Sequence, residues 1–121
     1  MRILIVEDEP KAGDYLLKGL TESGFVADLA RDGVDGLAHA REQHYDLIVL
    51  DVMLPGGLDG LEVCKAIRAD TRHRCKILML SAKAQLVDQF DGLMAGADEY
   101  IAKPFSVTEL LAKLHILNDR A

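Results

Sequence analysis

Acidic side chains, one hydroxyl and one ammonium group each stand directly after a short apolar or strand-like run of this sequence. They are Glu7 and Asp8, Asp51, Ser81 and Lys103, which follow Ile3–Val6, Leu47–Leu50, Ile77–Leu80 and Asp98–Ala102 respectively. Two carboxylates about 4 Å apart repel by roughly 1 kcal/mol in water and about 4 kcal/mol at a protein surface. A cluster of carboxylates therefore needs a cation, and a hard divalent ion such as Mg²⁺ suits oxygen ligands.

A magnesium site in this set has enough ligands. Asp8 and Asp51 supply carboxylates, the backbone carbonyl of Met53 supplies another oxygen, and Glu7 makes a contact through water. Phosphoryl transfer needs positioning and charge neutralisation more than covalent machinery. We therefore predict Asp51 as a carboxylate nucleophile.

Lys103 and Ser81 complete the predicted site as an ammonium and a hydroxyl that neutralise and hold the phosphoryl group. Each residue also has a simpler interpretation. The acidic run Glu7–Glu9 suits a helix N-terminus, Asp51 suits a turn, Ser81 suits a loop, and Lys103 suits a solvated surface. Their shared position at the ends of the runs favours a common site.

The apolar runs predict the strands that position these residues. Ile3–Val6, Leu47–Leu50 and Ile77–Leu80 contain no polar residue, as expected of strands that are covered on both faces. Phe25–Ala30 and Asp98–Ala102 are mixed with charge and are predicted at the sheet edges.

Segments with apolar residues at helical spacing lie between the predicted strands, and each segment has one apolar stripe that we expect to be buried. The five stripes run through Ala12–Leu20, Val34–Ala38, Leu61–Ile67, Leu86–Met94 and Val107–Leu117. Expected helix boundary residues are Gly24, Asp32 or Asp35, Asp59, and Ser106 with Glu109 as a capping box. Five βα units with right-handed crossovers predict an α/β fold, a doubly wound parallel sheet in the order 2-1-3-4-5. Its binding crevice lies beyond the carboxyl ends of the first and third strands.

Composition excludes several classes of protein. The 121 residues fit one domain, residues 1–121, and the net charge of −6 argues against direct nucleic-acid binding. Cys64 and Cys75 lack the spacing of a zinc site and are predicted to be reduced thiols. No apolar run has the length of a membrane span, and Glu7 comes too early for a secretory signal. We expect a cytoplasmic protein with no membrane contact.

Four motifs together resemble the receiver (CheY-like) domain of bacterial two-component response regulators, and they cover residues 1 to about 118. The motifs are Ile3–Pro10, Asp46–Pro55, Leu80–Ala82 and Gly96–Phe105. The first forty residues are similar to regulators that carry a winged-helix DNA-binding domain, including the heavy-metal-responsive group.

The resemblance implies that Asp51 accepts a phosphoryl group from a histidine kinase or from acetyl phosphate, with Mg²⁺ as cofactor. Asp8, Asp51 and the Met53 carbonyl would hold the metal, and Glu7 would orient a metal-bound water. Lys103 would pair with the phosphoryl oxygens.

The resemblance also implies a switch and an output. Ser81 would bond one phosphoryl oxygen, and Tyr100 would swing inward as Ser81 moves. This would couple the site to the surface formed by the fourth helix, fifth strand and fifth helix, through which the family forms homodimers and regulates transcription. A cis peptide before Pro104 would aim Lys103.

The sequence departs from the family at three places. The loop Gly56–Gly60 is one residue longer than usual, which predicts a displaced start of the third helix. Gln89 and Lys113 stand where winged-helix regulators usually carry arginine for ion pairs across the dimer. The residues after Leu114 lack a basic run. A stand-alone, excised or hybrid receiver that acts through protein contacts is therefore an alternative to a transcriptional regulator.

Two other classes of protein compete with a receiver. A haloacid-dehalogenase-like phosphatase uses an aspartate nucleophile with Mg²⁺, but it needs an acid two residues later, where this chain has Met53. A flavodoxin-like binder needs hydroxyl and glycine donors after the first strand, where the acidic run Glu7–Glu9 would repel phosphate. We therefore expect a switch with slow self-dephosphorylation at most, and not an enzyme.

Overall fold

The computed structural model describes residues 1–70, 74–81 and 95–119. Its five strands are all parallel and form one sheet in the order β2-β1-β3-β4-β5, which confirms the predicted topology. The strands are β1 (Arg2–Val6), β2 (Val26–Ala30), β3 (Leu47–Asp51), β4 (Lys76–Ser81) and β5 (Glu99–Ala102).

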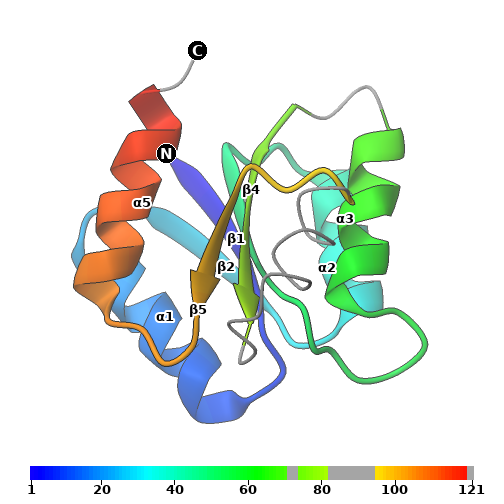
Figure 1. The fold of residues 1–121 in the computed structure, drawn as a ribbon, viewed down its shortest axis with the longest axis horizontal. Coiled ribbons are helices and arrows are strands. Elements are labelled where there is room, and N and C mark those ends of the chain that lie inside the picture. Colours follow the sequence, from blue (N-terminus) through cyan, green and yellow to red (C-terminus); the bar gives the residue numbers. More distant parts are fainter. Residues whose placement is uncertain (71–73, 82–94, 120–121) are drawn as a thin grey trace.

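Helices cover both faces of the sheet (Figure 1). The helices α1 (Pro10–Glu22) and α5 (Val107–Asp119) lie on one face, and α2 (Gly33–Glu42) and α3 (Gly60–Ala69) lie on the other. The helix expected over 86–94, with Gln89, lies outside the described residues.

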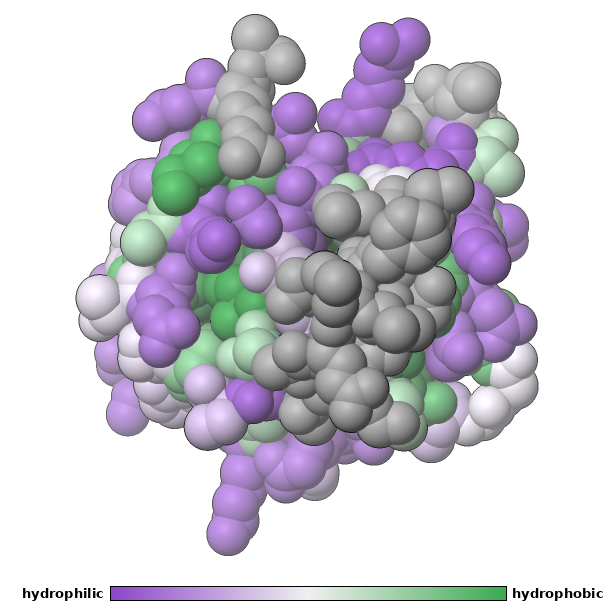
Figure 2. All heavy atoms as spheres, viewed as in Figure 1, coloured by the Kyte–Doolittle hydropathy of each residue, from purple (hydrophilic) through white to green (hydrophobic). Residues whose placement is uncertain are grey.

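Alternate residues of β1 show why the central strands contain no polar residue. Ile3 and Ile5 pack with α1 and α5, whereas Leu4 and Val6 pack with α2 and α3, and all four are fully buried. On the edge strand β2, by contrast, Val26 is 61% exposed. The two hydrophobic clusters hold the helices against the two faces of the sheet. Figure 2 shows hydrophilic residues around most of the visible rim of the molecule.

Side-chain caps begin the helices. The Asp32 carboxylate accepts a hydrogen bond from the Asp35 backbone N–H at 2.7 Å, so Asp32 and not Asp35 caps α2. Asp59 caps α3, and the Ser106 hydroxyl accepts from the Glu109 N–H at 3.1 Å at the start of α5. Glu9 caps α1, because its carboxylate accepts from the Lys11 and Ala12 N–H groups.

Cys64 and Cys75 are both free and buried, which confirms the predicted reduced thiols. Burial raises the pKa of Cys64 to about 11 and also raises the pKa of Cys75, so neither is a reactive thiolate at neutral pH. Within the described part of the chain, no helix has the length and apolar character needed to cross a membrane.

A polar contact fixes the edge strand β2 to the segment before β3. The Tyr45 hydroxyl donates to Asp28 Oδ2 at 2.7 Å, and an Arg2 nitrogen lies 3.1 Å from the same oxygen. The hydrogen bond from Tyr45 is the main reason that the pKa of Asp28 is lowered. The Asp28 carboxylate is therefore favoured in the folded state.

We expect Tyr45→Phe to lower the free energy of unfolding by about 1 kcal/mol at neutral pH, less than for a fully buried charged hydrogen bond because the Asp28 side chain is 33% exposed. A carboxyl group whose pKa is lower in the folded state than in the unfolded state stabilises the protein at pH values above its unfolded-state pKa. This contribution is lost as the pH falls through the folded-state pKa. The difference between the proteins should therefore shrink below pH 3.8, the ordinary value for Asp28. Urea unfolding across this pH range measures it. In an Asp28→Asn background, the loss of stability caused by Tyr45→Phe should not vary with pH. A loss that does not vary with pH in the native background would contradict the role of Asp28 as the partner of Tyr45.

Candidate functional site

Four strands bring polar residues to one rim of the sheet. Asp51 and Ser81 are the last residues of β3 and β4, while Glu7 and Lys103 follow β1 and β5. Glu7, Asp51 and Ser81 are buried, with 0%, 4% and 1% of their surface exposed. Buried carboxylates are costly unless they are paired, so their partners determine what the site can do.

Lys103 joins two of these carboxylates. Its Nζ lies 2.7 Å from Glu7 Oε1 and 2.6 Å from Asp51 Oδ2. Burial lowers the pKa of Lys103, but the hydrogen bonds to Asp51 and Glu7 outweigh this, and the net pKa is raised. The side chain is therefore an ammonium at neutral pH, shared between residues that come from β1 and β3.

Glu7 is the most constrained acid of the site. Burial and the neighbouring Asp51 raise the pKa of Glu7 to about 7, although Lys103 opposes the shift. Its second carboxylate oxygen, Oε2, is buried and has no hydrogen-bond partner among the residues that the structure describes. A single ammonium thus leaves the paired acids incompletely neutralised, and an uncompensated buried oxygen is a natural place for a further cation or its water.

Asp8 adds a third acid on the solvent side. One carboxylate oxygen from each of Glu7, Asp8 and Asp51 lies within 4.8 Å of the others, and Asp8 is exposed. The residues fit a hard cation, because three carboxylates converge and one buried oxygen lacks a partner within the described part of the chain. Glu9 lies apart from this cluster as the cap of α1, so the helix-terminus interpretation of the acidic run is correct for Glu9.

Met53 lies close to Asp51 through its backbone. The Met53 N–H donates to Asp51 Oδ1 at 2.9 Å, and the Met53 side chain is exposed. The hydrogen bond holds one oxygen of the Asp51 carboxylate, while the other faces Lys103. The two oxygens of Asp51 therefore have different partners and a fixed orientation.

Ser81 and Tyr100 belong to the neighbouring strands. The Ser81 carbonyl accepts from the Lys103 N–H at 2.7 Å, which ties the end of β4 to the Lys103 backbone. Tyr100, on β5, is partly buried against the hydrophobic cluster of the α2 and α3 face. The peptide bond between Lys103 and Pro104 is cis, as the resemblance implied.

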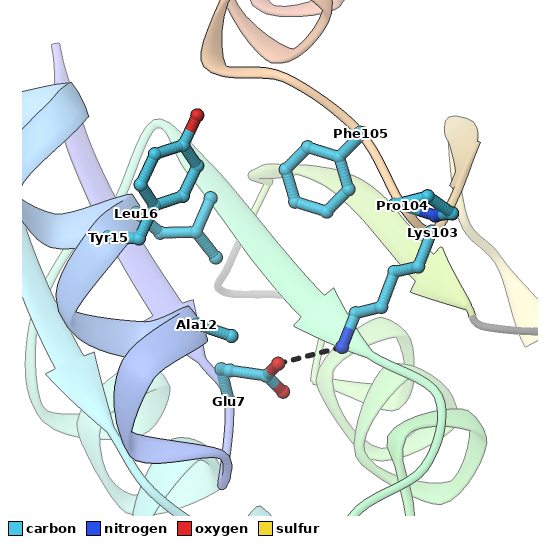
Figure 3. A pocket seen from close by; sticks show the side chains of 7 residues that line it. All are labelled: Glu7, Ala12, Tyr15, Leu16, Lys103, Pro104 and Phe105. Carbon is cyan, nitrogen blue, oxygen red and sulfur yellow. Dashed lines mark hydrogen bonds and ion pairs between the residues drawn. The ribbon is translucent and has the colours of Figure 1, made fainter.

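A cavity of about 470 Å³ lies between α1 and the segment after β5, next to the ion pair of Lys103 with Glu7. Figure 3 shows the Lys103 side chain extending along it toward Glu7, with Leu16 and Phe105 among its apolar walls. These walls help to explain why the Glu7 carboxylate is poorly solvated. No local sequence pattern predicted this cavity, because its walls come from segments some ninety residues apart, such as Leu16 and Phe105.

Residues 3–115 match the family described as the response regulator receiver domain. The chain belongs to this family. The receiver is 54% identical to the transcriptional activator protein IrlR of Burkholderia pseudomallei over 114 residues, which are 94% of this chain and 48% of that protein. It is 51% identical over 120 residues to the transcriptional regulatory protein PcoR of Escherichia coli, with 99% and 52% of the chains covered. The receiver therefore spans about half the length of these relatives.

Solved receiver structures share the fold. The response regulator protein TrrA of Thermotoga maritima, solved in complex with Mg²⁺ and a beryllium fluoride, is 37% identical to this receiver. The match has a TM-score of 0.84 and covers 96% of this chain and 97% of that one. The resemblance identified from the four sequence motifs is thus confirmed at the level of family and fold.

Proposed function

We propose that Asp51 accepts a phosphoryl group from a sensor histidine kinase, or from a small donor such as acetyl phosphate, in a magnesium-dependent reaction. The observation that carries the proposal is the position of the Asp51 carboxylate, which lies 2.6 Å from the Lys103 ammonium and within 4.8 Å of two further acids. A nucleophile, a fixed positive charge and a set of metal ligands thus meet at one strand end.

Glu7, Asp8 and Asp51 are the residues that would hold Mg²⁺, together with the backbone carbonyl of Met53. When bound, the ion supplies positive charge to neutralise the carboxylates and the phosphoryl oxygens. The unpartnered Oε2 of Glu7 supports an indirect role, in which Glu7 accepts a hydrogen bond from a metal-bound water.

The transfer itself needs little from the protein beyond orientation. A carboxylate oxygen of Asp51 forms a bond to phosphorus while the bond to the donor nitrogen of phosphohistidine, or to the donor oxygen of acetyl phosphate, breaks. The leaving group keeps the electron pair of that bond. Lys103 offers its ammonium to the phosphoryl oxygens, and Ser81 offers its hydroxyl to one of them.

We propose a switch and not an enzyme, with at most slow loss of the phosphoryl group. Rapid hydrolysis needs a group that positions and deprotonates an attacking water. Met53 stands two residues after Asp51, and its exposed thioether side chain cannot act as a base. This observation opposes a phosphatase of the haloacid-dehalogenase type.

The relatives named as transcriptional regulators support a transcriptional output. We propose that this output acts in the cytoplasm through a DNA-binding domain outside these residues. Tyr100 and the surface formed by β5, α5 and the helix expected over 86–94 would transmit the change, by homodimer formation. Lys113 forms an ion pair with Glu99 at 3.5 Å within this surface. A stand-alone receiver that acts through protein contacts is the alternative, favoured by the lysine at this position.

The proposal is tested by intact mass of the protein after incubation with acetyl phosphate, with and without Mg²⁺, and by light scattering of the same samples. We expect the mass of one phosphoryl group to be added only when Mg²⁺ is present, with slow decay after the donor is removed. Steady multiple turnover of a generic phosphate ester would overturn the switch. A monomer in all samples would favour the stand-alone alternative.

The variant Asp8→Asn should weaken Mg²⁺ binding with little effect on the stability of the fold. Asp8 is exposed, so its replacement should change the free energy of unfolding by only about 0.5 kcal/mol or less. Because one of three carboxylates is lost, Mg²⁺ affinity should fall by about ten-fold or more. Calorimetric titration with Mg²⁺ measures the loss. The matched control is Asp14→Asn, which removes an exposed acid that is paired with Arg31 and should bind Mg²⁺ like the native protein.

A further inference from the structure

The first residue of α3 lies against the backbone of Asp51. A Cβ atom on Gly60 would be 2.0 Å from the Asp51 carbonyl oxygen and 2.8 Å from the Val52 Cα. These atoms are backbone, so no side-chain movement can relieve the overlap. Gly60 does not have a positive φ, so the glycine is required here for space and not for backbone conformation.

The residue after Asp51, Val52, is held by backbone hydrogen bonds on both sides. The Val52 N–H donates to the Leu80 carbonyl of β4 at 2.9 Å, and the Gly60 N–H donates to the Val52 carbonyl at 3.0 Å. Gly60 thus forms a hydrogen bond and a close steric contact with the two residues that connect β3 to Met53. Any shift of this segment moves the Asp51 carboxylate relative to Glu7 and Asp8.

A capping box sets the position of Gly60. The Asp59 side chain accepts from the Glu62 N–H at 2.9 Å, and the Glu62 side chain accepts from the Asp59 N–H at 3.2 Å. The longer preceding loop leaves this capping box intact. Gly56 has a φ of +85° and, like Gly57, has open space around it, so the exposed turn accommodates the additional length.

We propose that Gly60 is a positioning residue for phosphoryl acceptance. Its missing side chain lets the capped start of α3 hold the Asp51–Met53 backbone at the depth where the three carboxylates converge. This inference rests on the proposed function of Asp51. It assigns to Asp59 and Glu62 a part in the geometry of the site as well as in the stability of α3.

The test compares Gly60→Ala with two other glycine variants. Gly57→Ala adds the same methyl group to the same loop in open space. Gly19→Ala adds it against Val107 at 2.8 Å, in the contact between α1 and α5 on the opposite face of the sheet. Mg²⁺ affinity by calorimetry and labelling by acetyl phosphate are measured at a temperature where thermal unfolding shows each variant to be folded.

We expect Gly60→Ala to slow labelling by about ten- to a hundred-fold, since small displacements of reacting groups cost rates of this order, and to weaken Mg²⁺ binding. Gly57→Ala should match the native protein in every measurement. Gly19→Ala should melt earlier but keep native Mg²⁺ affinity and labelling. Native labelling by folded Gly60→Ala, or an equal loss in Gly19→Ala, would overturn the proposal.

Asp59→Ala keeps the test decisive if Gly60→Ala does not fold. It frees the start of α3 without adding atoms, and Asp32→Ala is the matched loss of a cap on α2. Asp59→Ala should reduce Mg²⁺ affinity and labelling, while Asp32→Ala should lower only the melting temperature; equal effects of the two would contradict the proposal. If native protein binds Mg²⁺ but takes no label, the proposed function fails, and the Mg²⁺ comparison still tests the role of Gly60.

Discussion

Replacing Asp51 with Asn should abolish labelling by acetyl phosphate while the fold persists. The amide lacks the nucleophilic carboxylate oxygen, yet its carbonyl oxygen can still accept the hydrogen bond from the Met53 N–H. Lys103 keeps Glu7 as a partner at 2.7 Å. The lost attraction to Lys103 and the relieved repulsion among the acids oppose each other, each on the order of 4 kcal/mol at 4 Å and an effective dielectric constant of about 20.

Intact mass and thermal unfolding measure the two parts of this prediction. The Asp51→Asn protein should show no added phosphoryl group after prolonged incubation, and its melting temperature should stay close to the native value. Asp14→Asn, a change of the same kind at an exposed ion pair, should be labelled normally. A folded Asp51→Asn protein that still takes label would remove Asp51 as the acceptor.

Lys103→Ala should cause the largest loss of stability among the variants that remove a charge. It leaves Glu7 and Asp51 without their shared cation in a buried setting, and removing one partner of such a pair costs about 3–5 kcal/mol. Labelling of Asp51 should persist because the nucleophile and the three carboxylates remain. Dimer formation on labelling should be lost, because the phosphoryl oxygens have no ammonium to bind.

The pH dependence of the Lys103→Ala protein follows from Glu7. Lys103 lowers the pKa of Glu7, so its removal should raise that pKa further above the present value of about 7. A folded state that binds more protons than the unfolded chain loses stability as the pH rises, here from 4.5 through the raised folded value. Urea unfolding at several pH values checks this, and addition of Mg²⁺ should recover part of the loss.

Lys113→Ala is the matched control for Lys103→Ala. Lys113 pairs with Glu99 at 3.5 Å in a more exposed position, and surface pairs contribute only about 0–1 kcal/mol. A similar loss of stability in both variants would show that the Lys103 ion pairs have no special energetic role. Failure of Lys103→Ala to take any label would instead assign Lys103 a part in the transfer itself.

The architecture could be predicted from the sequence because the patterns that indicate strands and helix starts are local. The apolar runs at Ile3–Val6 and Leu47–Leu50 identify central strands, and Asp32 and Asp59 stand where helices begin. Parallel strands joined by right-handed crossovers bring their carboxyl ends to one edge. For that reason the residues after the runs could be assigned to one rim before any distance was known.

Only the tertiary structure resolved which of these residues meet and how closely. It separated Glu9, which caps α1, from Glu7 and Asp8, which lie beside Asp51. It also placed Lys103 between two acids that lie 52 and 96 positions away in the chain. These contacts depend on how strands and helices pack against one another, and packing distances of a few ångströms are not encoded in the type or spacing of neighbouring residues.

Gly60 shows most clearly that residue types and spacing do not predict packing contacts. In the sequence it is one of ten glycines and stands beside a predicted cap. Its contact with the Asp51 carbonyl exists only because α3 packs back over the end of β3. The sequence by itself thus determined the order of the strands, the family and the set of reactive groups, whereas the packing of α3 and the reach of Lys103 determined the geometry in which those groups can act.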